Sequence, residues 1–253
     1  MSLNIIGIGL ADEKDITVKG LELVKKSDVI YLESYTSKLA VPVSALERFY
    51  GKKVELADRK LVEIEAEENL LKPAKTKEIT LLVIGDALSA TTHIDLIQRA
   101  VEMKINTNVV HNASVLTAIG ATGLQLYKFG KVASIPFTHG DYEPDTPYAI
   151  LTENQSIGAH TLFLLDLKPD ENKFMTANDA LRYLQKLEIK QGKGLVKDNT
   201  LVVGCARLGA KDQLIFAGKA KDVIKKDFGA PVHCLIIPGK LHFVEEDALR
   251  CFQ

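Results

Sequence analysis

The sequence has few cysteines and no excess of either charge. Its three cysteines, Cys205, Cys234 and Cys251, form no C-x-x-C pair, which argues against a disulfide framework and against a thiolate zinc site. The 32 Lys and Arg residues nearly balance the 33 Asp and Glu residues, and no long run carries one sign. We therefore expect a cytoplasmic protein that binds neither nucleic acid nor an anionic membrane.

Long apolar runs and several common motifs are missing as well. No apolar run approaches the roughly 18 residues of a membrane span, and the N-terminus shows no basic segment followed by a long apolar core, so neither a span nor a signal peptide is predicted. The six histidines show no H-x-x-x-H or H-x-H spacing, so we expect no metal site. The G-x-S-x-G elbow of serine hydrolases and the phosphate-binding P-loop are also absent.

Strands and helices alternate along the chain, which predicts an α/β protein in both halves. The length of 253 residues and the 46% hydrophobic content allow one large domain or two compact ones. We expect an N-terminal α/β domain of residues 1–111 and a C-terminal α/β domain of residues 112–253. The periodicity predicts strands at residues 3–8, 29–33, 53–56, 79–84, 107–111, 132–137, 161–167, 200–206, 213–217 and 233–238. It predicts the longer helices at residues 61–75, 94–103, 148–157, 176–187 and 243–252.

The stretch of residues 85–93 joins a buried strand to a helix. Gly85 permits a sharp turn, Asp86 places a carboxylate at the strand tip, and Ser89 offers a hydroxyl group. Similar turns lie at Gly9-Leu10, Ser114-Val115, Leu165-Asp166 and Leu208-Gly209. Ligands of open α/β sheets bind beyond the carboxyl ends of the strands, so we expect these turns to converge on a cleft. Because they contain few basic residues, they suit a neutral or cationic ligand better than a polyphosphate.

A dinucleotide site is the main alternative at the first turn. Gly7-x-Gly9 follows a strand and Glu33 ends the next strand, which gives two thirds of the Rossmann fingerprint. The third glycine is replaced by Asp12, whose carboxylate would repel a pyrophosphate. The sequence therefore disfavours NAD or FAD at this turn.

The turns resemble those of the diphthine synthase branch of the tetrapyrrole methylase superfamily, the class III methyltransferases that use S-adenosylmethionine. The matching segments keep one order along the chain and include Asp15-Ile16-Thr17-Val18-Lys19-Gly20, Gly85-Asp86, Ala90-Thr91-Thr92-His93, Asn112-Ala113-Ser114, Tyr127-Lys128-Phe129-Gly130, His160-Thr161-Leu162 and Pro238-Gly239-Lys240-Leu241-His242. The superfamily at large shares only the early Gly-x-Gly and the Gly-Asp turn. Ala87 stands where such enzymes commonly have proline, so the turn is expected to be less rigid.

The resemblance implies two α/β domains of the class III methyltransferase fold, an active-site cleft between them, and a homodimer. It implies S-adenosylmethionine as methyl donor, S-adenosylhomocysteine as product, and no metal. The acceptor would be a histidine of translation elongation factor 2 that carries an aminocarboxypropyl group, whose amine is methylated repeatedly to give diphthine. The positions that match the donor-binding residues of the family are Leu10, Asp86, Ser89, Ser114, Val115, Leu165, Leu208 and His233.

Several questions stay open at this stage. Asp166 and His233 are candidates for a weak proton acceptor, although Asp166 is equally well explained as a cap of the loop that follows its strand. A related class III methyltransferase acting on a tetrapyrrole or another small acceptor, and a nicotinamide-dependent dehydrogenase, are the alternative functions. The loop from Tyr142 to Pro147 is either a partner contact or a solvated connection.

Overall fold

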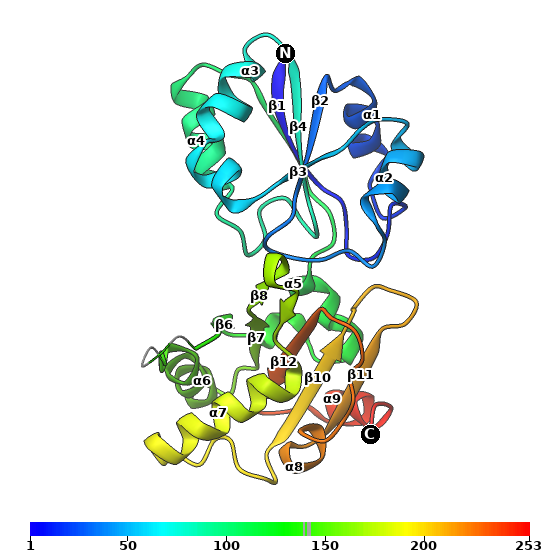
Figure 1. The fold of residues 1–253 in the computed structure, drawn as a ribbon. Coiled ribbons are helices and arrows are strands. Elements are labelled where there is room, and N and C mark those ends of the chain that lie inside the picture. Colours follow the sequence, from blue (N-terminus) through cyan, green and yellow to red (C-terminus); the bar gives the residue numbers. More distant parts are fainter. Residues whose placement is uncertain (139, 141–142) are drawn as a thin grey trace. The chain divides into compact units, whose positions relative to one another are not determined.

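The computed structural model describes residues 1–138, 140 and 143–253. The chain forms two compact units, Met1–Ala118 and Ile119–Gln253, which are drawn in Figure 1. We had placed the division earlier, after residue 111. Each unit contains its own five-stranded sheet, and the α/β class expected from the sequence is confirmed.

The sheet of unit 1 is parallel, with the strand order β3-β2-β4-β1-β5. Its strands are β1 (Ser2–Gly7), β2 (Val29–Glu33), β3 (Glu55–Ala57), β4 (Glu78–Val83) and β5 (Thr107–Val110). Every residue of β1 is buried, as expected for a parallel strand with helices on both faces. Because successive side chains point to opposite faces, Leu3 and Ile5 belong to one hydrophobic cluster and Ile6 to another.

Helices cover both faces of this sheet. On one face lie α1 (Val18–Lys26) and α2 (Val43–Tyr50), and on the other lie α3 (Lys72–Ala74) and α4 (Ile94–Glu102), as Figure 1 shows. The first helix begins at Thr17, whose side-chain oxygen accepts a hydrogen bond from the Gly20 amide at 3.0 Å. No helix within the described residues is long and apolar enough to cross a membrane.

The prediction of one helix over residues 61–75 was wrong. The structure has two π-helical turns, Lys60–Ile64 and Glu67–Leu71, followed by the short α3. Pro73 has no N–H group, so a continuous α-helix would lose one of its hydrogen bonds there. The wider turns also allow the adjacent Leu70 and Leu71 to be buried together.

The sheet of unit 2 is mixed, with the order β11-β10-β12-β7-β6. Its strands are β6 (Ala133–Ile135), β7 (Thr161–Leu165), β10 (Leu201–Ala206), β11 (Leu214–Lys219) and β12 (His233–Ile237). Only β6 and β7 pair in parallel. The strand predicted at residues 213–217 is confirmed as β11, which pairs with β10 in antiparallel orientation.

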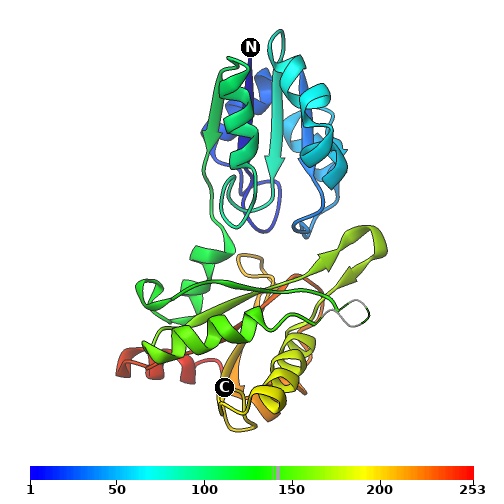
Figure 2. The same ribbon diagram turned by 90° about the vertical axis from the view of Figure 1, so that its left-hand side faces the viewer.

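The core of unit 2 lies between its sheet and three helices. These are α6 (Thr146–Ser156), α7 (Ala177–Gln191) and α8 (Ala220–Val223), which contribute Leu151, Leu184 and Val223 to one cluster. The terminal helix α9 (Phe243–Arg250) lies on the side of the sheet opposite α7, as Figure 2 shows.

Two connections in unit 2 differ from a simple loop. A small hairpin of β8 (Leu167–Lys168) and β9 (Lys173–Phe174) follows β7, where the sequence predicted only a longer strand.

In the loop from Tyr142 to Pro147, Tyr142 lies outside the described residues. Glu143 forms ion pairs with Lys186 and Lys190 of α7, so the described part of this loop is attached to that helix.

Candidate active site

The carboxyl ends of β1, β4 and β5 bring three turns together at one edge of the unit 1 sheet. Gly9 donates its N–H to the carbonyl of Gly85 at 3.1 Å, and Gly85 donates to Gly9 at 2.7 Å. This pair joins the turn after β1 to the turn after β4. The candidate residues Leu10, Asp86, Ser89, Ser114 and Val115 all lie in these turns or directly after them.

Asp86 is the centre of this edge, and its carboxylate is fully engaged. One oxygen accepts from the amides of Leu88 and Ser89, each at 3.0 Å, and from the Ser89 hydroxyl at 2.9 Å. The other accepts from His111 Nδ1 and the Asn112 amide, each at 2.9 Å. Burial alone would raise the pKa of Asp86, but these hydrogen bonds outweigh it and lower the pKa to about 2. The carboxylate therefore shapes the turn and has little capacity left for a ligand.

Close backbone approach explains the glycines of the first turn. A Cβ on Gly7 would lie 2.7 Å from the Gly85 carbonyl oxygen, and Gly9 has a φ of +80°, which favours glycine. The Asp15 carboxylate accepts from the amides of Leu10 and Ala11 at 3.1 and 2.7 Å. Asp15 thus stabilises this turn, and the helix that follows is capped by Thr17.

Asn112 is a site-forming residue whose role the sequence did not reveal. Its side-chain amide donates to the carbonyls of Gly7 and Asp15 at 3.0 and 2.9 Å. It thereby connects the end of β5 to the end of β1 and to the loop before α1. The helix after this turn is capped by Ser114, whose hydroxyl oxygen accepts the Leu116 amide at 3.1 Å.

The remaining candidates lie together at one edge of the unit 2 sheet. In the strand register Cys234 is opposite Leu164 and Ala206 is opposite His233. The end of β7, the end of β10 and the start of β12 therefore share an edge. This edge carries Leu165, Asp166, Leu208 and His233.

The two candidate proton acceptors differ in what their side chains already bind. One Asp166 oxygen accepts the Phe137 amide at 2.9 Å, and the other accepts the Leu167 amide at 2.9 Å. Each carboxylate oxygen has further lone pairs, so Asp166 retains acceptor capacity.

His233 has both ring nitrogens engaged. Nδ1 accepts from the Ala177 amide at 3.3 Å, which assigns the proton to Nε2, and Nε2 donates to the Ala230 carbonyl at 3.0 Å. Burial is the main reason that the pKa of His233 is lowered. The ring is therefore held neutral with no free lone pair, which argues against a role as proton acceptor.

A buried polar cluster lies at the opposite end of β7. Glu245 and His160 are both fully buried and are joined by a hydrogen bond of 2.9 Å from His160 Nε2. Lys128 also pairs with Glu245, and the Gly239 amide donates to His160 Nδ1 at 2.9 Å. Burial alone would raise the pKa of Glu245, but hydrogen bonds led by that from Lys128 lower it to about 2. These residues bring the Tyr-Lys-Phe-Gly, His-Thr-Leu and Pro-Gly-Lys-Leu-His segments together.

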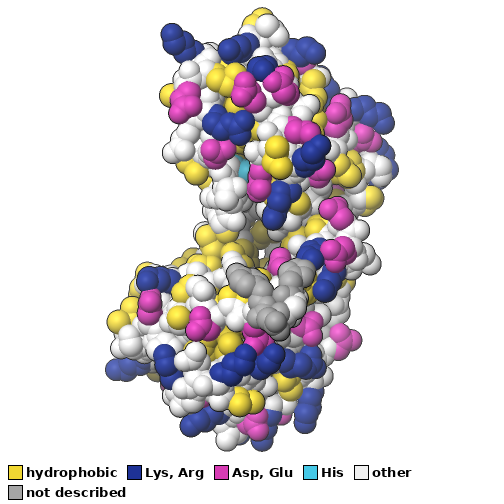
Figure 3. Space-filling model, turned by 60° about the vertical axis from the view of Figure 1, so that its left-hand side comes forward, with side chains coloured by type: hydrophobic (Ala, Val, Ile, Leu, Met, Phe, Trp, Pro, Cys, Tyr) yellow, Lys and Arg dark blue, Asp and Glu magenta, His cyan; other side chains and the backbone are white. Residues whose placement is uncertain are grey.

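The chemistry of the two edges suits a cationic or uncharged ligand. The turns of residues 9–12, 85–90 and 112–115 contain no Lys or Arg. In unit 2 the Arg207 guanidinium is held by Asp212 at 2.6 Å and by the Phe228 carbonyl at 2.8 Å. Figure 3 shows positive and negative side chains interspersed over the face in view. Among the described residues no three His, Cys, Asp or Glu side chains are grouped to hold a metal ion.

Comparison with known proteins relates the whole chain to one family. The model for tetrapyrrole (corrin/porphyrin) methylases matches residues 2–224. The diphthine synthase of Methanocaldococcus jannaschii is 45% identical over 251 residues, which cover 98% of this chain and 97% of the relative. The diphthine methyl ester synthase of Dictyostelium discoideum is 42% identical over 270 residues and covers 100% and 98%. A solved structure of an Entamoeba histolytica protein matches with a TM-score of 0.92 at 46% identity and covers 100% and 98%.

Proposed function

Because the chain belongs to the diphthine synthase branch of the tetrapyrrole methylase family, we propose that it methylates a modified histidine of translation elongation factor 2. The methyl donor is S-adenosylmethionine, and the reaction belongs to diphthamide biosynthesis. The acceptor atom is the amine of the aminocarboxypropyl group on that histidine. The observation that carries the proposal is the identity of 45% and 42% to relatives named diphthine synthase and diphthine methyl ester synthase, over nearly their whole length.

The residues at the two sheet edges fit a sulfonium donor. The edge of unit 1 offers backbone groups and hydroxyls around a buried carboxylate, without a lysine or arginine in its turns. A cation is compatible with such a lining, whereas a phosphate would need the opposite polarity. We propose that Leu10, Ser89, Ser114 and Val115 contact the donor, and that Asp86 acts mainly by fixing the turn.

In unit 2 the proposed donor contacts are Leu165, Leu208 and His233. The side chain of Leu208 is largely buried, and the neutral ring of His233 fixes the start of β12 against the first turn of α7. These groups shape the edge and do not supply charge. We propose no metal and no covalent nucleophile for the reaction.

The mechanism needs alignment and removal of one proton. S-adenosylmethionine supplies a methyl group on a good leaving group, so the chain has to hold the acceptor amine in line with it and exclude water. An α-amine has a reference pKa of roughly 7.7 to 8.0 and is partly neutral near pH 7. The Asp166 carboxylate, with acceptor capacity to spare, accepts the proton that the amine loses before it attacks the methyl carbon, and it stabilises the ammonium group that forms as the bond to sulfur breaks. Asp166→Asn should therefore lower kcat, and an unchanged kcat at saturating substrates would remove Asp166 from the mechanism.

The decisive experiment is mass spectrometry of elongation factor 2 that carries the unmethylated aminocarboxypropyl-histidine. The factor is incubated with the protein and S-adenosylmethionine, and the modified peptide is analysed. We expect a gain of methyl masses on that peptide. If the factor is unchanged but the protein still binds S-adenosylhomocysteine, the proposed acceptor is wrong and the protein is a related methyltransferase with another acceptor. If the factor is unchanged and S-adenosylhomocysteine does not bind, the proposed donor is wrong as well.

The same measurement distinguishes two products. One relative is named a diphthine synthase and the other a diphthine methyl ester synthase. We propose methylation of the amine, and an additional ester would appear as one methyl mass that mild alkali removes. The proposal also includes a homodimer in the cytoplasm. Sedimentation of the purified protein tests the homodimer.

A further inference from the structure

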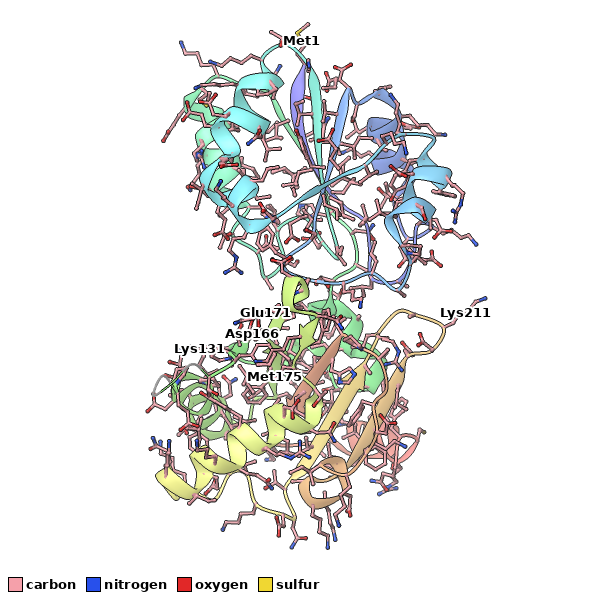
Figure 4. All side chains as sticks on the ribbon, in the orientation of Figure 1. Met1, Lys131, Asp166, Glu171, Met175 and Lys211 are labelled. Atoms are coloured by element: carbon pink, nitrogen blue, oxygen red, sulfur yellow. The ribbon has the colours of Figure 1, made fainter. Side chains whose placement is uncertain are left out.

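The β8–β9 hairpin places charged side chains beside Asp166. The hairpin begins directly after Asp166, and the Met175 amide at its end donates to the Asp166 carbonyl at 3.0 Å. Figure 4 labels Asp166 and Met175 at the base of this hairpin and Glu171 at its tip. The two lysines Lys168 and Lys173 are directly opposite each other in the register, so their side chains share one face.

Lys173 is held close to the same residue that Asp166 binds. Its Nζ lies 4.3 Å from the centroid of the Phe137 ring, a cation–π distance. The backbone amide of Phe137 donates to Asp166 at 2.9 Å. Phe137 therefore contacts an ammonium group with its ring and a carboxylate with its backbone amide.

Two other cations near this edge are already paired. Lys168 Nζ binds Glu171 at 3.2 Å, and Arg207 binds Asp212 at 2.6 Å. Within the described part of the chain Lys173 pairs with no carboxylate, and it is exposed. Lys173 is thus a cation of this edge that remains available to an anionic group of a ligand, and among the cations named here it is the one beside Asp166.

We propose that Lys173 binds the carboxylate of the acceptor while Asp166 faces its amine. This inference rests on the proposed function, in which the acceptor is an α-amino acid group with both an amine and a carboxylate on one carbon. Lys173 and Asp166 present the complementary pair of charges around Phe137. The arrangement selects an amino acid acceptor over an amine without a carboxylate, and it orients the amine.

The test is the kinetics of Lys173→Met with elongation factor 2 as acceptor. One charge-assisted contact is worth enough to raise KM for the factor by about tenfold when it is lost. We expect kcat to change by less than about threefold, because the contact exists before and during methyl transfer. Lys173→Arg keeps the cation and should restore KM to within about threefold of the unaltered protein.

Lys168→Met is the matched control, since it removes a lysine from the same face of the same hairpin. We expect its KM to stay within about twofold, because Lys168 is paired with Glu171. Equal increases in KM for both variants would overturn the proposal, because they would mean that the positive charge of the hairpin attracts the factor without a specific contact from Lys173. An unchanged KM for Lys173→Met would also overturn it.

Failure of this inference can be told from failure of the proposed function. If the unaltered protein does not methylate the factor, the function is wrong. If it methylates the factor and Lys173→Met does so with the same KM, only the role of Lys173 is wrong. Affinity for S-adenosylhomocysteine, measured by calorimetry, should be equal in all three variants, and a loss in Lys173→Met would place the residue in the donor site instead.

Discussion

Replacing Asp86 with asparagine tests whether this carboxylate is the structural centre of the unit 1 edge. The aspartate accepts five hydrogen bonds, and three of them come from backbone amides. An asparagine oxygen can still accept from Leu88 and Ser89, but its NH₂ group then faces the amide of Asn112. Two donors oppose each other there, and the half-buried Asn112 amide is left without an acceptor.

The expected cost follows from these contacts. Loss of a charged acceptor costs roughly 1.5 to 3 kcal/mol, and an unpaired buried amide costs roughly 1 to 3 kcal/mol. We therefore expect Asp86→Asn to lower the free energy of unfolding of unit 1 by about 3 to 5 kcal/mol. Urea denaturation monitored by circular dichroism measures the loss, and hydrogen exchange of peptides from residues 1–118 assigns it to this unit.

The pH dependence gives a second measurement. The pKa of Asp86 is lowered from 3.8 to about 2. The ionised carboxylate therefore adds its full share to the free energy of unfolding above about pH 4, and this share is lost as the pH falls towards 2. The contribution amounts to about 2 kcal/mol, and Asp86→Asn should lack it. The control is Asp95→Asn on the exposed face of α4, where the ion pair with Arg99 spans 3.4 Å; it should cost less than about 0.5 kcal/mol. A loss below about 1 kcal/mol for Asp86→Asn at neutral pH would refute the reasoning.

Three further predictions concern other parts of the two edges and the buried cluster. Glu245→Gln leaves Lys128 without its buried carboxylate, and urea denaturation should show that the free energy of unfolding falls by about 3 to 5 kcal/mol. A fall below about 1 kcal/mol would contradict the stabilising role of the His160–Glu245 cluster. Gly7→Ala places a methyl group 2.7 Å from the Gly85 carbonyl oxygen, and calorimetry should show affinity for S-adenosylhomocysteine falling more than about tenfold; equal affinity would mean that the turns can shift freely. Burial keeps the pKa of His233 below the ordinary value of 6.5, so the stability it contributes is complete above that pH and is lost as the pH falls below it. NMR of the ring should show titration below pH 6.5, and titration above it would contradict the neutral, buried ring.

Much of the site could be predicted because its signals are local. Strand β2 follows the predicted residues 29–33, and the glycines at the ends of β1 and β4 indicated turns where the structure has them. The carboxyl ends of parallel strands share an edge of the sheet, so residues far apart in sequence could be expected to meet in each unit.

The parts that could not be predicted depend on distant partners. Asn112 is bound to Gly7 and Asp15, and nothing near Asn112 in the sequence indicates these carbonyls. The role of Lys173 depends on Phe137, which precedes it by a whole helix and strand. The hairpin of β8 and β9 was missed because each strand has only two residues, too few to show an alternating pattern.

The single strand β7 begins at the His160–Glu245 cluster and ends at Asp166. With the proposed role of Asp166, the two ends of this strand have different tasks, one in stability and one in binding. Substitutions at the start of β7 act on the stability of unit 2, so additional stabilising mutations elsewhere would compensate for them. If Asp166 faces the acceptor as proposed, substitutions at the end of β7 change the fit to the acceptor, and a gain in stability elsewhere would not restore activity. An enzyme of this fold could therefore change its substrate through one end of a strand while the other end keeps the domain folded.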